Sequence, residues 1–231
     1  MELELHHLMG TVTFEAGADD AYEVTLVRRG TGQTAQAALV NRDTIRLGVT
    51  HPERERHVVE TLAWHFPDFD RAIDYVRRGE YPAEAHVFVK APARAHVLLC
   101  SWGGTVAIQG AIGRVKVLTS SGQVDVAGFK GLAGIVTGSG AVFLGEGTDA
   151  KIKVRTVSGF VYAQNYIGYL DLRSRTGKIT ATYEKLGPGD QHFWTREGAV
   201  DVTVPRTAEL LVEVHGDRAL LSNELPLSQV Q

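Results

Sequence analysis

Apolar and polar residues alternate along the middle of the chain in a pattern that returns about every 18 residues. Glycines mark the repeat, and the intervals between them are 18, 18, 19, 18 and 21 residues. They are Gly104, Gly122, Gly140, Gly159, Gly177 and Gly198. Apolar residues follow each glycine by two and four positions, as Val124 and Val126 follow Gly122. Because residues two apart on a strand face one side, each repeat predicts short strands with a shared apolar interior.

Each repeat also carries turn signals. A serine or threonine precedes each of these six glycines by three residues, as Thr137 precedes Gly140 and Thr156 precedes Gly159. Glycine suits turns that need a positive φ, and a nearby hydroxyl can bond the backbone of such a turn. We therefore expect positive φ at Gly122, Gly159 and Gly177.

The length of the repeat selects the fold class. A βαβ unit needs roughly 30 residues and a propeller blade about 40 to 45, so about 18 residues fit neither. One coil of a β-helix fits, with successive coils stacked about 4.8 Å apart in parallel register. The sequence thus predicts an all-β protein, a single-stranded β-helix (β-solenoid), with a small helical insertion.

Four regions are predicted along the chain. Residues 1–50 form an N-terminal β segment that caps the solenoid, because the alternation there is looser. Residues 51–80 form the helical insertion, since Thr50 and Glu53 make a capping box and Val58, Leu62 and Phe66 follow helical spacing. Residues 81–221 form the solenoid with a C-terminal cap, and residues 222–231 form a mobile tail.

The recurrent phrase of the repeat is Thr-x-Ser-Gly-x-Val-x-Val-x-Gly, preceded by an extended strand around Val87 and Val89 that ends at Pro92. These features resemble a bacterial family of adhesin-type β-solenoid domains of unknown function. The resemblance covers roughly residues 84–205 and, more weakly, residues 1–50. It implies a non-enzymatic domain, often exported or tethered to a membrane.

Composition narrows the function classes. The net charge of −3 over 231 residues does not favour nucleic acid or an anionic membrane as a partner. The single cysteine excludes an internal disulfide framework. The first residues have no basic or continuous apolar stretch of a signal peptide, and no apolar run is long enough to insert in a membrane. We therefore expect a cytoplasmic protein.

Candidate chemistry on the predicted strands is sparse. The outward carboxylates are Asp125, Asp171 and Asp201. Asp125 and Asp201 fall in one column four coils apart, about 19 Å, whereas a glycosidase pair needs about 5 to 9.5 Å. No metal-ligand spacing stands out. We therefore expect no enzyme activity, no catalytic residues, no metal and no cofactor.

Two outward surfaces are candidate contact sites. Lys153, Arg155, Arg173 and Arg175 would stack into a basic stripe, extended by Lys116 and Arg196. The stripe is either a solvated face or a site for an anionic polymer or acidic partner.

The second candidate surface is the aromatic set Phe143, Phe160 and Tyr162, expected in consecutive coils of one outward column. These side chains are covered by the insertion, form a homo-oligomer interface, or contact a ligand such as a glycan. The leading hypothesis is a non-catalytic, adhesin-like structural or binding module that self-associates, with a protein or glycan as a possible further partner. The alternative is a carbohydrate-active or carbohydrate-binding β-helix protein.

Overall fold

The computed structural model describes residues 2–7, 10–17, 22–28, 34–39, 44–48, 85–92, 95–101, 103–110, 113–145, 147–208, 211 and 213. These residues form 17 strands and contain no helix. The predicted helical insertion at 51–80 and the tail at 222–231 lie outside the described residues. Within the described residues, no helix is long and apolar enough to cross a membrane.

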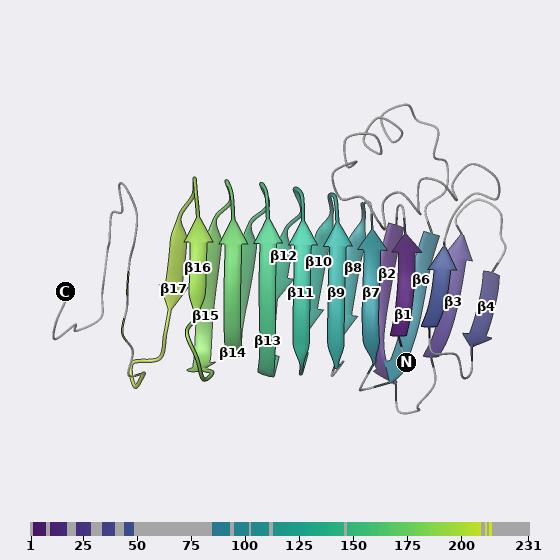
Figure 1. The fold of residues 1–231 in the computed structure, drawn as a ribbon, viewed down its shortest axis with the longest axis horizontal. Coiled ribbons are helices and arrows are strands. Elements are labelled where there is room, and N and C mark those ends of the chain that lie inside the picture. Colours follow the sequence, from purple (N-terminus) through teal and green to yellow (C-terminus); the bar gives the residue numbers. More distant parts are fainter. Residues whose placement is uncertain are drawn as a thin grey trace.

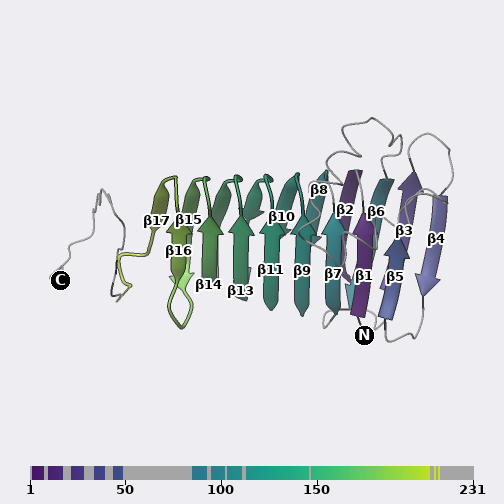
Figure 2. The ribbon, with the colours of Figure 1, turned by 45° about the horizontal axis from the view of Figure 1, so that its top comes forward.

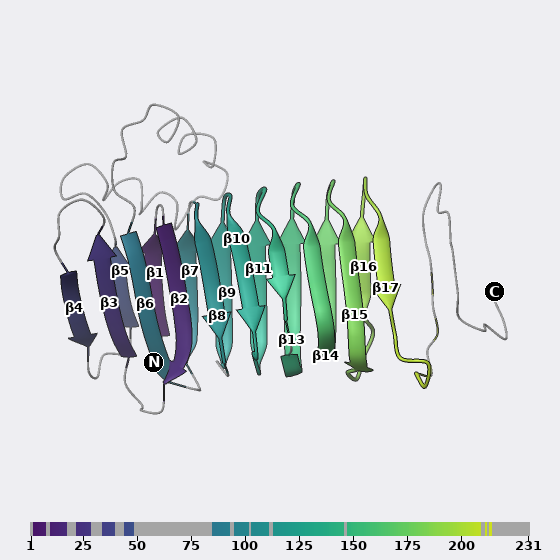
Figure 3. The same cartoon turned by 180° about the vertical axis from the view of Figure 1, so that it is seen from behind.

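The strands belong to two facing sheets that run the length of a solenoid (Figures 1 and 3). The first strands of the coils are β7 (His96–Ser101), β9 (Arg114–Thr119), β11 (Leu132–Thr137), β13 (Gly147–Thr156) and β16 (His192–Thr195). The second strands are β8 (Thr105–Gln109), β10 (Gln123–Ala127), β12 (Val142–Leu144), β15 (Ile179–Leu186) and β17 (Val200–Thr203). The long strand β14 (Val161–Ser174) contributes to both sheets.

The pairing is parallel and in register, as the repeat predicts. Val124 pairs with Val106 of the preceding coil and with Val142 of the next, each 18 residues away. In the other sheet, Ile135 pairs with Val117 and Val154. The β-solenoid with coils of about 18 residues is therefore confirmed.

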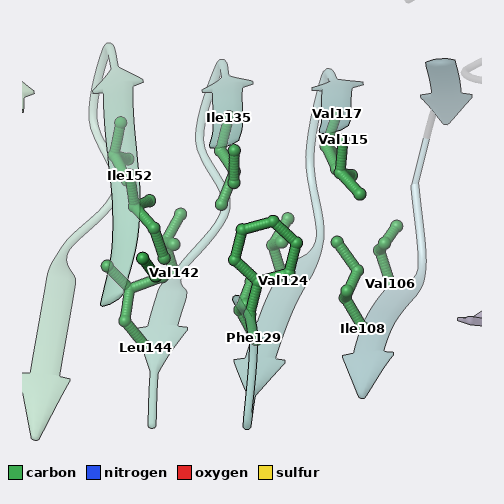
Figure 4. Packing of buried hydrophobic residues seen from close by; sticks show 14 of the residues in the cluster. Val106, Ile108, Val115, Val117, Val124, Phe129, Ile135, Val142, Leu144 and Ile152 are labelled. Carbon is green, nitrogen blue, oxygen red and sulfur yellow. The ribbon is translucent and has the colours of Figure 1, made fainter. Parts of the chain in front are cut away.

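The core lies between the two sheets (Figure 4). Val124, Val142 and Val161 are fully buried or nearly so. Val124 and Val142 face Ile135 and Ile152 of the opposite sheet. Each coil contributes four or so apolar side chains, which it cannot bury alone. Stacking buries them in continuous columns, so stability depends on neighbouring coils being present.

The repeat glycines form a column of their own, and the reason for glycine differs from the prediction. Gly122 has the predicted positive φ of 119°. Gly159 and Gly177 do not fall in the left-handed region, so the prediction is wrong there. At both positions a Cβ atom would collide with the carbonyl oxygen of the glycine one coil earlier. Close stacking of coils, rather than φ alone, requires glycine.

The predicted hydroxyl ladder is present beside this column. Thr137, Thr156 and Ser174 are buried. Their side-chain oxygens accept the backbone N–H of Gly140, Gly159 and Gly177 at 3.0, 2.9 and 2.8 Å. Each hydroxyl therefore satisfies a donor at the turn where the ladder of coil-to-coil bonds is interrupted.

The N-terminal strands enter the stack out of sequence order. β1 (Glu2–His7) lies between β5 (Thr44–Gly48) and β7, and β2 (Gly10–Gly17) lies between β6 (Ala85–Pro92) and β8 (Figure 2). β3 (Tyr22–Arg28) pairs antiparallel with β6, and β4 (Thr34–Leu39) pairs antiparallel with β3. The first residues of the chain thus form an inner coil, and later residues complete the end of the solenoid around it.

The opposite end of the solenoid is more exposed. Val200 and Val202 continue the inner columns of β15, where Ile179 and Ala181 are buried. They are nevertheless 43% and 37% exposed. Among the described residues, no strand pairs with the outer edge of β17.

Candidate functional site

The candidate surfaces lie on the outward sides of the two sheets. We call the outward side of β9, β11, β13, the second half of β14, and β16 the basic face. We call the outward side of β8, β10, β12, the first half of β14, β15 and β17 the aromatic face. Parallel register sets outward residues in columns along the solenoid, about 4.8 Å apart.

The aromatic face carries the three predicted rings as one cluster, the aromatic patch: Phe143, Phe160 and Tyr162. The ring centroids of Phe143 and Phe160 are 5.4 Å apart, and those of Phe143 and Tyr162 are 6.4 Å apart. Both pairs meet edge to face, which is a favourable geometry for aromatic rings. Phe160 is 47% exposed, whereas Phe143 and Tyr162 are half-buried.

The patch spans two coils rather than three. Phe143 and Tyr162 are register partners in one column. Phe160 precedes Tyr162 by two residues, so it stands in the neighbouring column of the same coil. The expectation of one column in consecutive coils was wrong, because Phe160 and Tyr162 are two residues apart in the chain and therefore lie in one coil.

Polar groups flank the aromatic patch on both sides along the solenoid. On the side of β10, Asp125 is the register partner of Phe143, and the Gln123 amide donates to both of its carboxylate oxygens at 2.7 and 2.9 Å. On the side of β15, Thr180 is the register partner of Tyr162, and Lys178 lies 3.7 Å from Asp201. The patch is therefore an apolar island between an acidic side and a side that carries a lysine.

The structure brings the four residues of the predicted basic stripe together. Lys153 and Arg155 extend from β13, and Arg155 is the register partner of Arg173 in β14. Arg175 follows in the turn after β14, where its backbone carbonyl accepts the N–H of Glu197 of the next coil. All four side chains are exposed.

Asp171 is part of the same face, yet it is only 4% exposed. The Arg173 guanidinium donates to its two carboxylate oxygens at 2.8 and 3.3 Å. This hydrogen bond, followed by the charge of Asp171, raises the pKa of Arg173. Asp171 therefore holds Arg173 in place, and it is not a free outward carboxylate as the sequence suggested.

A cluster of largely buried aromatic side chains at one corner of the last coils was not predicted from the sequence. Tyr166, Tyr183 and Phe193 stack edge to face, at centroid distances of 6.0 and 6.4 Å. The Tyr166 hydroxyl donates to the Ala150 carbonyl at 3.0 Å. Burial raises the pKa of both tyrosines. The signal that could have revealed the cluster is the aromatic residue recurring at one place in successive coils.

Gln191 completes that corner. Its side-chain oxygen accepts from the Tyr183 hydroxyl at 2.9 Å and from the Leu170 backbone N–H at 2.8 Å. Its amide donates to the Gly189 carbonyl at 3.1 Å. One side chain thus joins two coils to the loop before β16. This is a structural role, since every partner is a buried or backbone group.

The structure does not bring together the three outward carboxylates named from the sequence, Asp125, Asp171 and Asp201. Asp125 and Asp201 are joined by the register chain Phe143, Tyr162 and Thr180, which separates them by four coils. At about 4.8 Å per coil the separation is about 19 Å. Asp171 is neutralised by Arg173. Among the described residues, no group of three His, Cys, Asp or Glu side chains could hold a metal ion.

Comparison with known proteins finds no family model, no curated protein and no solved structure that matches this chain. The resemblance to adhesin-type β-solenoid domains therefore remains a prediction, and the proposals below depend on the two faces themselves.

Proposed function

We propose that this protein is a non-catalytic structural or binding module, adhesin-like in that it works through exposed surfaces, and that it self-associates through the aromatic patch. The observation that carries the proposal is the edge-to-face cluster of Phe143, Phe160 and Tyr162 on an open sheet face. A contiguous exposed apolar cluster on a soluble protein marks a contact site more often than scattered apolar residues do.

A second copy is the partner that the shape of the face favours. Two flat sheet faces can meet about a two-fold axis, so that the same patch serves both copies. Interfaces are enriched in Tyr and Phe at their buried centres, with polar groups at the rim. The aromatic patch has this composition, since its polar neighbours lie on the flanking coils.

The charges beside the patch favour one orientation. If the two-fold axis runs parallel to the strands between β12 and β14, the β10 side of one copy lies opposite the β15 side of the other. Asp125 then faces the partner's Thr180, and Lys178 lies two residues from Thr180 along the chain. The arrangement brings Asp125 of one copy toward Lys178 of the other, whose exposed ion pair with Asp201 it would join, and this favours it over the alternatives.

The wide separation of the outward carboxylates Asp125 and Asp201 supports a non-catalytic role. A retaining or inverting glycosidase holds its two carboxyl groups within about 9.5 Å. The separation of Asp125 and Asp201 is about twice that. Binding without catalysis is therefore the simpler use of this surface.

A second candidate function for the patch is glycan binding. The Gln123–Asp125 pair, hydrogen-bonded at 2.7 and 2.9 Å, offers polar groups beside Phe143, which is the register partner of Asp125. A sugar could stack on the ring and bond to this pair. It would leave the protein monomeric, so mass in solution separates the two candidates.

The test is light scattering during size-exclusion chromatography at tens of micromolar. We expect twice the mass of one chain for the wild type, and a single-chain mass for Phe143→Ser/Phe160→Ser/Tyr162→Thr at unchanged melting temperature. Leu132→Ser is the matched control, because Leu132 is a 43% exposed apolar residue of β11, on the opposite face of the solenoid. A monomeric wild type would contradict self-association, and glycan binding lost in the triple variant would then support the second candidate.

A further inference from the structure

The basic face has a charge pattern that the aromatic face lacks. Its strand segments 114–119, 132–137, 151–156, 168–174 and 192–195 contain Arg114, Lys116, Lys151, Lys153, Arg155 and Arg173, against the single acid Asp171. The facing segments 105–109, 123–127, 142–144, 161–163, 179–182 and 200–203 contain no Lys or Arg and two acids, Asp125 and Asp201. The positive charge is therefore concentrated on one side of the solenoid.

These cations are largely without internal partners. Within the described part of the chain, the ion pairs are Arg173 with Asp171 and Lys178 with Asp201, and only the first lies on the basic face. Lys151 lies over the Tyr169 ring, 4.7 Å from its centroid. The other two acids of the last coil, Asp190 and Glu197, lie in the turns that flank β16. A row of like charges held on a rigid sheet repels itself unless an external anion neutralises it.

The cations are densest over the last three coils. Arg155 and Arg173 are register partners, so they stand about 4.8 Å apart along the solenoid. Lys151, Lys153 and Arg155 alternate along β13, at about 6.6 Å from one to the next. Arg175 and Arg196 extend the same row in the turns after β14 and β16. The result is a two-dimensional lattice of positive charge, suited to a ligand with repeated anionic groups.

Trp194 adds a second kind of contact to this lattice. It is the register partner of Arg173, and it is 52% exposed. Arg173 is oriented by Asp171 through two N–H groups, which leaves three of its five N–H donors for another acceptor. A flat apolar ring beside an oriented guanidinium offers stacking and carboxylate recognition within one column.

This combination points to an acidic sugar polymer rather than to a nucleic acid. Nucleic-acid sites usually occur in strongly basic domains and stack successive bases on several rings. This chain has a net charge of −3, and Trp194 is the one strongly exposed Phe, Tyr or Trp side chain among the described residues of the basic face. Arginine, which pairs with carboxylates in a bidentate geometry, supplies Arg155, Arg173, Arg175 and Arg196 of the dense region.

We propose that the basic face binds a carboxylate-bearing polysaccharide over the β13, β14 and β16 coils. The carboxylates lie against Arg155, Arg173, Arg175 and Arg196, and one sugar ring stacks on Trp194. The site is on the opposite side of the solenoid from the aromatic patch. It is therefore open in both a monomer and the proposed two-fold assembly, and it does not rest on the proposed self-association.

The test is a titration of the full chain with polygalacturonate, with dextran as a neutral polymer and a deoxythymidine homopolymer as a nucleic acid. We expect polygalacturonate to bind in a salt-sensitive manner and dextran not to bind. Arg155→Ser/Arg196→Ser should weaken binding about tenfold or more, and Trp194→Ala about fivefold. Lys185→Ser/Arg206→Ser, which removes the same charge outside the basic face, should leave the affinity within about twofold, because distant charges are screened.

Four outcomes would overturn the proposal: no binding of polygalacturonate, equal loss in both double variants, no effect of Trp194→Ala, or tighter binding of the deoxythymidine polymer. Unchanged thermal melting of each variant shows that a lost affinity is not a lost fold. The aromatic triple variant should bind polygalacturonate as the wild type does, so failure of this proposal and failure of self-association can be told apart.

Discussion

The basic face and the aromatic face are built on the same coils, and their inward residues are alike. On both sheets the inward columns are Val, Ile, Leu and Ala, and they are buried throughout the middle of the stack. The outward columns differ: one side gathers arginines and lysines around Trp194, and the other gathers three aromatic rings between Asp125 and Thr180. The two faces therefore share the same backbone arrangement. The chemistry of each face is set by the outward side chains, which are every second residue of a strand.

A solenoid can carry two different surfaces with little loss of folding stability. Outward residues contribute to stability mainly through neighbours in their own column. Inward residues and turn glycines contact several coils at once, so changes there disturb the whole lattice. Substitutions should thus fall into two classes, those that break the stack and those that alter only one face.

The largest effect is expected from a charge in the shared interior. Val124→Asp would place a carboxylate in a fully buried column between Val106 and Val142. We expect a loss of about 4 kcal/mol or more in the free energy of unfolding, measured by urea denaturation. Val161→Asp should behave in the same way. Thr105→Asp, on an outward position of β8, is the control and should change little; equal stability of all three would contradict the assigned register.

The next largest loss of stability is expected at a glycine with no room for a side chain, compared with a glycine that has open space around it. A Cβ at Gly159 would collide with the Gly140 carbonyl, whereas a Cβ at Gly134 meets nothing within 4 Å. Gly159→Val should therefore cost at least about 2 kcal/mol, through forced separation of coils. Gly134→Val should stay within about 1 kcal/mol of the wild type, since valine suits a strand. Comparable losses at both sites would show that the glycine column is not what sets the coil spacing.

Gln191→Ala tests the corner that joins the last coils. It would leave the Tyr183 hydroxyl and the Leu170 N–H without their shared acceptor. Each buried donor left without a partner costs about 1–3 kcal/mol, so we expect a loss in that range. Thermal melting measures it, with Gln164→Ala on an exposed position of β14 as the control. No difference between the two variants would show that water replaces Gln191 without cost.

The smallest effect is expected from charges at the rim of the aromatic patch. In the proposed two-fold arrangement, Asp125→Lys places like charges together across the interface and should weaken association about three- to tenfold. Adding Lys178→Asp puts opposite charges together again and should restore part of the lost association. Sedimentation velocity over a concentration series gives both dissociation constants. Failure of the second change to restore association would reject this orientation, while the patch itself could still form the interface.

Local patterns predicted the repeat, the buried columns and the hydroxyl ladder, because each depends on residues a few positions apart. Thr156 and Gly159, for example, meet within one turn. The reason for glycine at Gly159 and Gly177 was not predictable in the same way, since it depends on the carbonyl of the preceding coil. A residue pattern alone does not distinguish a turn that needs positive φ from a turn that needs space.

Three further features were not predicted correctly from the sequence. β1 lies between β5 and β7, although the chain reaches these strands at residues 44 and 96. Asp171 is hydrogen-bonded to Arg173 and only 4% exposed, so outward parity did not mean exposure. The aromatic patch was predicted by its residues and misjudged in its layout, because the boundary of β14 places Phe160 and Tyr162 in one coil.

The most direct test of the account is a pair of interchain distances measured by double electron–electron resonance on spin-labelled protein. Two singly labelled proteins are made in a Cys100→Ser background. One carries its label on the aromatic face at Thr180→Cys, and the other carries its label on the basic face at Lys153→Cys. Because facing sheets lie about 10 Å apart, a two-fold assembly through the aromatic patch places the labelled basic faces about 30 Å apart or more and the Thr180 labels clearly closer. A shorter distance for the Lys153 label than for the Thr180 label, or no interchain distance from either, would contradict the assignment of the aromatic face to self-association.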